Sequence, residues 1–261
     1  MHRALRQTVR SAVLATAAAL IAAPALMAQI PGMPLYTNPR YGSGVRVHAD
    51  LGNSSEPSIA HQTLQAGVSM ALGPVGFSAS LGSTTENLTS LNTCTTHPTA
   101  DCSRKKLSAA ALGQFRVLGD GNSEVTVAIF GGLATDLSMT DAVDCGQYTG
   151  IAATVCNIDK KNNSAKRLTI PVGASVSAHI PLLITSVNVW AAPRYSFNTM
   201  MNCPDGASCG SNGGDIRFAV GADMPILGLF ALRAAYDMGK VGGQSANFFG
   251  LGGSIGFGGV H

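Results

Sequence analysis

The chain has 261 residues, of which 12% are charged and 31 are glycine, and its formal net charge is +3. An ordinary soluble domain carries about 25% charged residues, so this chain has few charges with which to cover a water-exposed surface. The small and scattered positive charge excludes a nucleic-acid footprint. Beyond the N-terminus there is no run of roughly 18 to 20 apolar residues, which excludes a protein that crosses a membrane with helices.

Residues 1–28 have the composition of an export signal. They contain Arg3, Arg6 and Arg10, then an alanine- and leucine-rich run, then small residues around Ala25 and Ala28. This order is typical of a secretory signal peptide and predicts an exported chain whose mature part is residues 29–261. Two alternatives remain open, namely cleavage after Ala25 and retention of the segment as a membrane anchor.

The mature chain divides into ten segments in which apolar residues alternate with small or polar ones, the period of a β-strand. In order, the segments are residues 44–52, 63–73, 75–82, 107–119, 124–134, 167–178, 186–197, 215–224, 229–238 and 248–259. Short turns are expected at residues 73–74, 119–122, 180–183 and 225–228, and the other connections are longer. Pro171 and Pro193 lie inside two segments and cannot donate to a strand ladder, so they mark bulges or strand ends.

The charged residues of these segments lie on the face opposite the apolar one, as Arg46 and Asp50 do opposite Val45 and Val47. A soluble barrel with this pattern would expose mostly glycine, serine and alanine, which is a poor surface for solubility. A barrel in lipid requires the pattern, because a lipid-facing charge costs about 2 to 4 kcal/mol near the midplane. The predicted fold is therefore all-β, a transmembrane antiparallel up-and-down β-barrel of about ten strands, with short periplasmic turns and long extracellular loops.

The lumen of such a barrel is narrow. It is predicted to contain Arg46, His48, Asp50, Arg116, Glu124, Arg194, Arg217, Asp223, Arg233 and Asp237. Arg116 should face Glu124 across one turn and Asp223 should face Arg233 across another, with Arg217 and Asp237 further up. Two interpretations are open: ion pairs that plug and stiffen the barrel, or a small pore that its arginines make favourable to anions.

The six cysteines fall in the predicted external loops as Cys94 and Cys102, Cys145 and Cys156, and Cys203 and Cys209. Six cysteines allow about 15 pairings, and the sequence alone does not choose among them. One pair per loop is the simplest hypothesis, and disulfides suit an exported protein. A zinc site is the weaker alternative, because there is no Cys-x-x-Cys and the histidines are scattered.

An enzyme is considered because His48 and Asp50 share the lumenal face of one segment, where a carboxylate can orient an imidazole. No second acidic pair matches them, no serine lies in a nucleophile elbow, and no cofactor motif is present. The sequence therefore predicts a protein that is not an enzyme and has no cofactor and no metal.

The longest predicted loop contains Lys160, Lys161 and Lys166. This cluster is either a solvated loop surface or a contact for the phosphates of lipopolysaccharide. A surface-binding or adhesion barrel that acts through its loops is therefore an alternative to a structural barrel or channel.

Together, the ten alternating segments, the N-terminal signal and the terminal run FFGLGGSIGFGG resemble the small outer-membrane β-barrel proteins of Gram-negative bacteria, the OmpA- and OmpW-like group. The resemblance implies a location in the bacterial outer membrane, contact with its lipid and lipopolysaccharide, and a structural or small porin-like role. In that group the barrel-assembly machinery reads an aromatic residue in the last strand. Phe257 stands in that position, although Gly-Gly-Val-His follows it.

Overall fold

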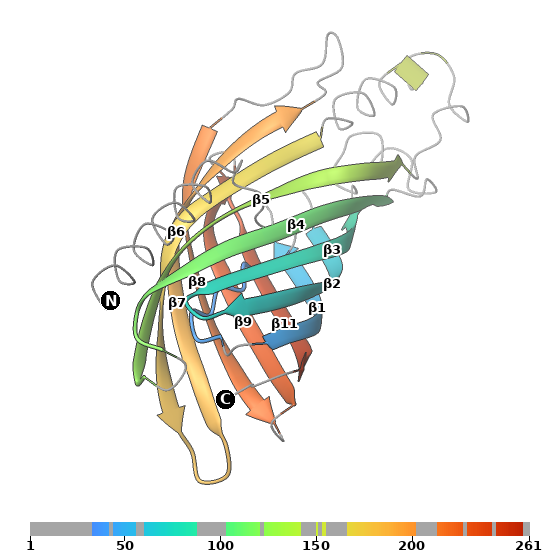
Figure 1. Cartoon of the computed structure of the whole chain (residues 1–261). Coiled ribbons are helices and arrows are strands. Elements are labelled where there is room, and N and C mark those ends of the chain that lie inside the picture. Colours follow the sequence, from blue (N-terminus) through green and yellow to red (C-terminus); the bar gives the residue numbers. More distant parts are fainter. Residues whose placement is uncertain are drawn as a thin grey trace, which may run out of the picture.

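Eleven strands make up the architecture of the chain (Figure 1). The computed structural model describes residues 33–41, 44–55, 60–87, 103–120, 123–141, 150, 153–154, 166–201, 213–226, 229–241 and 244–257. The strands are β1 (Gly44–Ser55), β2 (Ala60–Leu72), β3 (Val75–Asn87), β4 (Ser103–Leu118), β5 (Val125–Asp141), β6 (Lys166–Pro181), β7 (Ser186–Met201), β8 (Gly213–Ile226), β9 (Phe230–Val241), β10 (Gln244–Ser245) and β11 (Asn247–Phe257). Among the described residues, no helix is long and apolar enough to cross a membrane.

The sheet closes on itself. Each long strand is antiparallel to the next along the chain, and β11 pairs with both β9 and β1, where Val45 lies opposite Phe257. The two-residue β10 pairs with the end of β9, so ten strands form the wall. The predicted ten-stranded antiparallel barrel is confirmed, and the glycine-rich terminal run is its closing strand.

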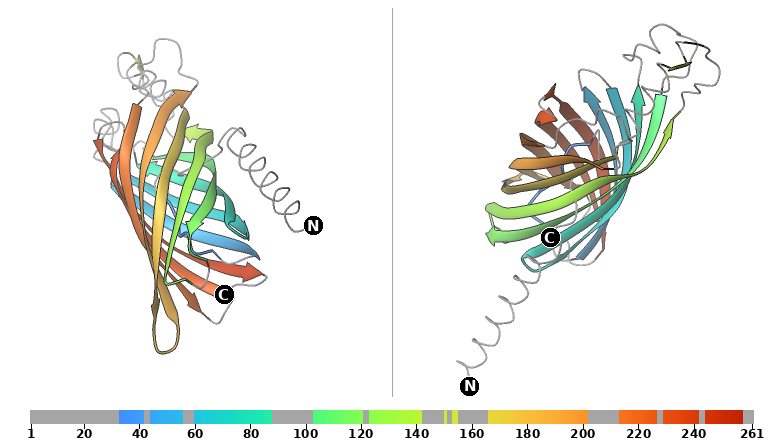
Figure 2. Two further views of the ribbon diagram at one scale, coloured as in Figure 1. Left: turned by 60° about the vertical axis from the view of Figure 1, so that its left-hand side comes forward. Right: turned by 90° about the horizontal axis from the view of Figure 1, so that it is seen from above.

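The strands are longer than the sequence pattern indicated. β4, β6 and β7 have 16 residues each and β5 has 17, whereas about 9 to 11 residues cross the hydrocarbon core. Figures 1 and 2 show the β6–β7 hairpin extending past its neighbours at the end where the short turns lie, here called the short-turn end. Its turn, predicted at residues 180–183, lies at residues 182–185, because pairing continues to Pro181 and Ser186.

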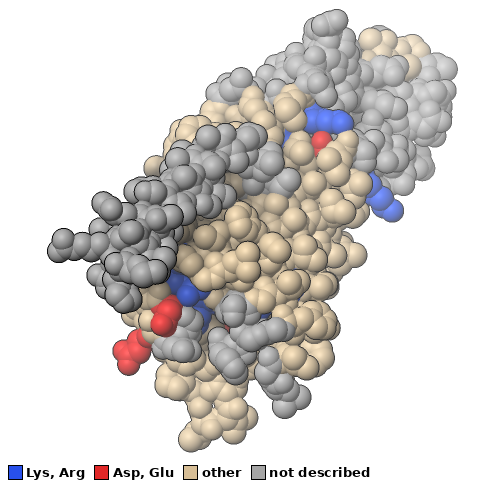
Figure 3. Space-filling view, viewed as in Figure 1, with Lys and Arg blue, Asp and Glu red and all other residues tan. Residues whose placement is uncertain are grey.

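The outer face of the wall is apolar along its length. Val45, Val47 and Leu51 are exposed on β1, whereas His48 and Asp50 between them are buried. The same alternation continues through β11, where Leu251 and Ile255 point outward. Figure 3 shows a broad uncharged surface on one side of the barrel, with charged residues gathered toward its two ends. This distribution matches a hydrocarbon belt between two water interfaces.

The two strand prolines interrupt the hydrogen-bond ladder locally. Pro171 lies in β6, where the β5–β6 register passes from Gly131↔Val172 to Ala134↔Thr169. Pro193 lies in β7, where the β6–β7 register skips residues 192–193. Because proline has no N–H to donate, each strand continues past its proline with one stretch of partner contacts missing.

Replacing Leu251 with arginine tests the lipid-facing side. Leu251 lies in the middle of β11, directly opposite Leu51 of β1, and is 52% exposed. We expect Leu251→Arg to lower the free energy of unfolding from lipid vesicles by about 2 to 4 kcal/mol, the cost of a charge near the bilayer midplane. The matched control is Leu118→Arg at the short-turn end of β4, which should cost about 0 to 1 kcal/mol. Equal losses in a urea titration would contradict the assignment of the faces.

Candidate functional site in the barrel lumen

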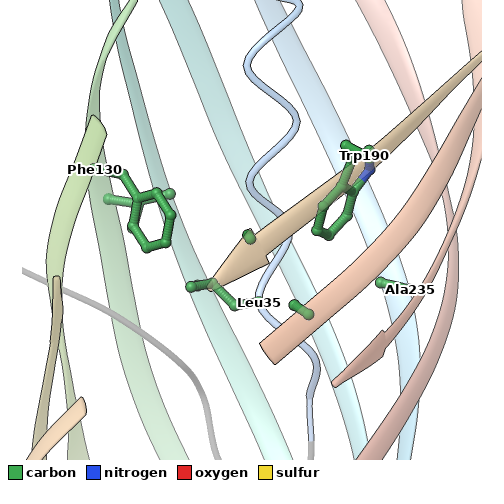
Figure 4. Packing of buried hydrophobic residues seen from close by; sticks show 7 residues of the cluster. Leu35, Phe130, Trp190 and Ala235 are labelled. Carbon is green, nitrogen blue, oxygen red and sulfur yellow. The ribbon is translucent and has the colours of Figure 1, made fainter. Parts of the chain in front are cut away.

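Residues 33–41 lie inside the barrel, a feature that the strand pattern did not predict. Met33 and Leu35 are almost fully buried. Leu35 packs in one cluster with Leu112, Phe130 and Trp190, which point inward from β4, β5 and β7. Figure 4 shows Leu35 on this internal segment between Phe130 and Trp190. The core of this protein is therefore in its lumen, and the chain's own N-terminal part supplies one side of it.

Polar contacts hold the internal segment along its length. The Leu35 backbone N–H donates to Asp237 Oδ2 at 3.2 Å, and Asn38 Nδ2 donates to Asp223 Oδ2 at 2.9 Å. At the short-turn end, the Tyr41 hydroxyl donates to the Pro74 carbonyl at 2.7 Å. These contacts place residues 33–41 between the middle of the lumen and the short-turn end.

Two arginines of the wall stack on tyrosines of the internal segment. The Arg233 guanidinium lies 4.2 Å from the centre of the Tyr36 ring, and that of Arg116 lies 4.5 Å from the centre of the Tyr41 ring. Arg116 also donates to the Tyr41 carbonyl at 2.6 Å. A cation over an aromatic face contributes about 0.5 to 2 kcal/mol, so each pair helps to fix the segment to the wall.

Glycines on the inner face provide room for the segment. A Cβ at Gly250 would lie 2.6 Å from the Tyr36 hydroxyl oxygen, and one at Gly76 would lie 3.0 Å from the Tyr41 ring. At these two positions the space beside the glycine is filled by residues 33–41. One sequence signal pointed to this arrangement. Small residues line the inner face of several strands, and the N-terminal segment lacks the alternation of a strand.

Asp237 is the centre of a buried ion-pair network. Its carboxylate accepts from Arg194 Nη2 at 2.5 Å and from Arg217 Nη2 at 3.0 Å, and all three side chains are at most 2% exposed. Arg217 also donates to the carbonyls of Lys240 and Ala246. A second pair joins Asp50 of β1 to Arg233 of β9. The Arg194–Asp237 contact joins β7 to β9 and the Asp50–Arg233 contact joins β1 to β9, in each case two strands that are not neighbours in the sheet.

The structure brings most of the predicted lumenal residues together. Those on the inner side of the wall are Arg46, His48, Asp50, Arg116, Arg194, Arg217, Asp223, Arg233 and Asp237. Asp223 and Arg233 are opposite in register as expected. Arg233, however, pairs with Asp50, while Asp223 accepts from Asn38 and from Trp190 Nε1 at 2.8 Å.

The predicted pair of Arg116 and Glu124 was wrong. A register shift between Arg116 and Leu118 places Arg116 opposite Ala128, and β5 begins only at Val125. Glu124 therefore lies in the turn and is exposed. Its backbone carbonyl accepts from the His179 N–H at 2.9 Å, while Arg116 turns to Tyr41 of the internal segment.

The geometry around His48 differs from a catalytic pair. Asp50 is engaged by Arg233, and His48 Nδ1 has no hydrogen-bond partner among the described residues. Within the same part of the chain, no three His, Cys, Asp or Glu side chains come close enough to hold a metal ion. The Asp50 carboxylate thus orients an arginine of β9 instead of the imidazole.

Several predictions fall on residues outside the described ranges. They are the signal peptide at residues 1–28, the six cysteines at 94, 102, 145, 156, 203 and 209, and the lysines at 160 and 161. Lys166 is described, and its Nζ donates to the Leu137 carbonyl at 2.6 Å.

Gly221→Ala tests the packing of Trp190 in the lumen. A Cβ at Gly221 would lie within 3 Å of both the Trp190 indole and the Ala234 carbonyl oxygen. We expect a loss of about 1 to 3 kcal/mol in unfolding free energy, typical of overpacking, and a shifted emission maximum of Trp190, the single tryptophan. Gly253→Ala is the control, because its Cβ would meet no atom closer than 3.7 Å. Unchanged emission and stability in Gly221→Ala would show that the indole lies elsewhere.

No protein-family model matches the chain, and no curated protein matches it. Solved structures similar to it include the translocator domain of the autotransporter NalP from Neisseria meningitidis, with 13% identity and a TM-score of 0.44 over 83% of this chain and 89% of that chain. The β-domain of the Bordetella autotransporter BrkA has 10% identity and a TM-score of 0.45 over 82% and 99%. Neisserial surface protein A has 12% identity and a TM-score of 0.35 over 82% and 96%.

These similarities concern the arrangement of strands. The closed sheet, the apolar outer face and the charged inner face are observed in this chain itself. An antiparallel barrel with this distribution satisfies its backbone hydrogen bonds without an edge and presents hydrocarbon to lipid. The chain has the fold of a small bacterial outer-membrane β-barrel.

Proposed function

We propose that this protein is a closed, non-conducting barrel of the bacterial outer membrane, with a structural role and no catalytic activity. The observation that carries the proposal is the filled lumen, in which Leu35 of the internal segment packs in one cluster with Phe130 of β5 and Trp190 of β7. Ten strands enclose little more space than the eight-stranded barrels that side chains fill. One extended segment in addition to these side chains is enough to block a continuous water path.

The ion-pair network supports the same role. An arginine-lined pore needs guanidinium groups that face water, whereas Arg194 and Arg217 are buried and share Asp237. Arg194 Nη2 and Arg217 Nη2 both donate to the Asp237 carboxylate. The interpretation in which ion pairs plug and stiffen the barrel therefore accounts for these residues better than the porin-like one.

Surface binding is a second candidate, which the long strands favour. β4 to β7 exceed the length needed to cross the bilayer, so parts of these strands lie beyond the hydrocarbon core. At this long-loop end the exposed Lys105 and the cation of Lys166 lie on β4 and β6. We infer that these lysines contact the anionic headgroups of lipopolysaccharide. We also infer that the cysteines form disulfides in the loops. The signal peptide and the barrel-assembly machinery would bring the protein to the outer membrane.

Conductance measurement in a planar lipid bilayer tests the proposal. The refolded chain is first checked for heat-modifiable migration on a gel, so that only folded protein is added. We expect no current steps in potassium chloride, because residues 33–41 occupy the lumen. Discrete steps that grow with salt concentration and favour anions would overturn the proposal and support a pore.

A further inference from the structure

A cavity of about 130 Å³ lies between the internal segment and the inner face of β1 to β4. Its lining includes Tyr41 and Ala71, next to the turn at residues 73–74, so it lies in the short-turn half of the barrel. A cavity of roughly 150 Å³ accommodates benzene. The space is therefore sufficient for a guest of about five or six heavy atoms.

Arg46 is the distinctive group in this cavity. Arg194, Arg217 and Arg233 each have a carboxylate partner, whereas the Arg46 guanidinium has no hydrogen bond or ion pair with any described residue. Its side chain projects from β1 into the lining of the cavity. Arg46 is half-buried, and its guanidinium offers the cavity N–H donors of the kind that an oxyanion accepts.

One carboxylate of the cavity lining lies near Arg46. The charged residues of the lining are Arg40, Arg46, Arg233 and Asp223. Asp223 attracts the Arg46 guanidinium and Arg233 repels it. The Asp223 carboxylate already accepts hydrogen bonds from Asn38 and Trp190. Arg233 is paired with Asp50, so Asp223 is the carboxylate of the lining that faces Arg46.

Neutral donors surround the same space. His48 is 5% exposed and lines the cavity with an Nδ1 atom that has no partner among the described residues. The amide of Gln65 and the hydroxyl of Ser69 belong to the lining as well. Arginine N–H groups form bidentate hydrogen bonds with oxyanions, and amide, hydroxyl and imidazole N–H groups supply the remaining donors.

We propose that this cavity binds a small inorganic oxyanion such as phosphate, with Arg46 as its principal ligand. The anion enters from the short-turn end and completes the hydrogen bonds of Arg46 and of the donors beside it. The site goes beyond the structural role proposed above, and it needs no current through the barrel. Absence of phosphate binding would not contradict a closed lumen, and ion conductance through the barrel would not contradict phosphate binding in the cavity.

Trp190 provides the readout. Its indole N–H donates to Asp223, which lines the cavity, and it is the single tryptophan of the chain. The folded full chain is titrated with sodium phosphate against sodium chloride at constant ionic strength, and bound phosphate is counted in parallel by equilibrium dialysis. We expect saturable phosphate binding, accompanied by a change in Trp190 emission that chloride does not produce.

Two variants and a matched control make the test specific. Arg46→Gln should weaken phosphate binding about 10- to 100-fold, the loss expected for a charged hydrogen bond. Arg46→Lys keeps the charge without the guanidinium fork and should bind more weakly than wild type but more strongly than Arg46→Gln. Lys240→Gln removes one exposed cation of β9 that lies outside the cavity lining and should bind as wild type. No saturable binding to the wild type, or equal binding to folded wild type and Arg46→Gln, would overturn the proposal.

Discussion

Asp237→Asn is expected to lower the free energy of unfolding by about 3 to 5 kcal/mol, because removing one partner of a buried ion pair leaves charges uncompensated. Here a single carboxylate holds two guanidinium groups, Arg194 and Arg217, and all three side chains are almost inaccessible to solvent. It also accepts the backbone N–H of Leu35 in the internal segment. The substitution should therefore loosen the wall and the segment together. Urea unfolding of the barrel in lipid vesicles measures the loss.

Glu124→Gln is the matched control for this experiment. It removes the same charge from an exposed turn residue whose backbone carbonyl, which the substitution keeps, accepts from His179. A change within about 0.5 kcal/mol is expected, as for other surface substitutions. If Asp237→Asn unfolds at the same urea concentration as Glu124→Gln, the network does not stabilise the barrel.

Deleting residues 33–41 is expected to convert a silent barrel into one that shows discrete current steps. The deletion removes Leu35 from the cluster around Trp190, and Tyr36 and Tyr41 from the spaces beside Gly250 and Gly76. Water can then enter beside the arginines of the inner wall. Because arginines outnumber aspartates among the predicted lumenal residues, the steps should favour anions. The measurement is single-channel conductance with a salt gradient, after heat-modifiable migration has confirmed folding.

A shorter deletion is the control for the longer one. Removing residues 29–32 leaves every described contact of the internal segment in place, and this variant should stay silent. A folded barrel that lacks residues 33–41 and still carries no current would show that wall side chains alone close the lumen.

The wall of the barrel could be predicted from the sequence because its pattern is local. A strand with one face in lipid repeats every two residues, so Val45 and Val47 already show which way Arg46 and His48 point. Turn residues such as Gly73 and Pro74 fix the hairpin between β2 and β3, and Leu72 pairs with Val75 as expected. The closing strand follows from the same alternation, with Leu251 and Ile255 facing out.

The contents of the lumen could not be predicted in this way, because they depend on contacts between distant residues. Asp50 and Arg233 are 183 positions apart, and Leu35 and Asp237 are 202 apart. Hairpin geometry places Asp223 opposite Arg233, but it does not determine whether Arg233 forms its ion pair with Asp223 or with Asp50. The internal segment has no alternation of its own, because it forms no strand in the wall. Its position follows from the side chains that it meets across the barrel.

The most direct test of the internal segment is a nuclear Overhauser measurement on the folded barrel, between the methyl protons of Leu35 and the indole protons of Trp190. The two side chains belong to one buried cluster (Figure 4), and Trp190 is the single tryptophan. A cross-peak between them, with Leu35 methyl shifts displaced by the aromatic rings, is the expected result. Leu35 methyl signals at random-coil shifts with no cross-peak to Trp190 would place the segment outside the lumen and contradict the closed barrel.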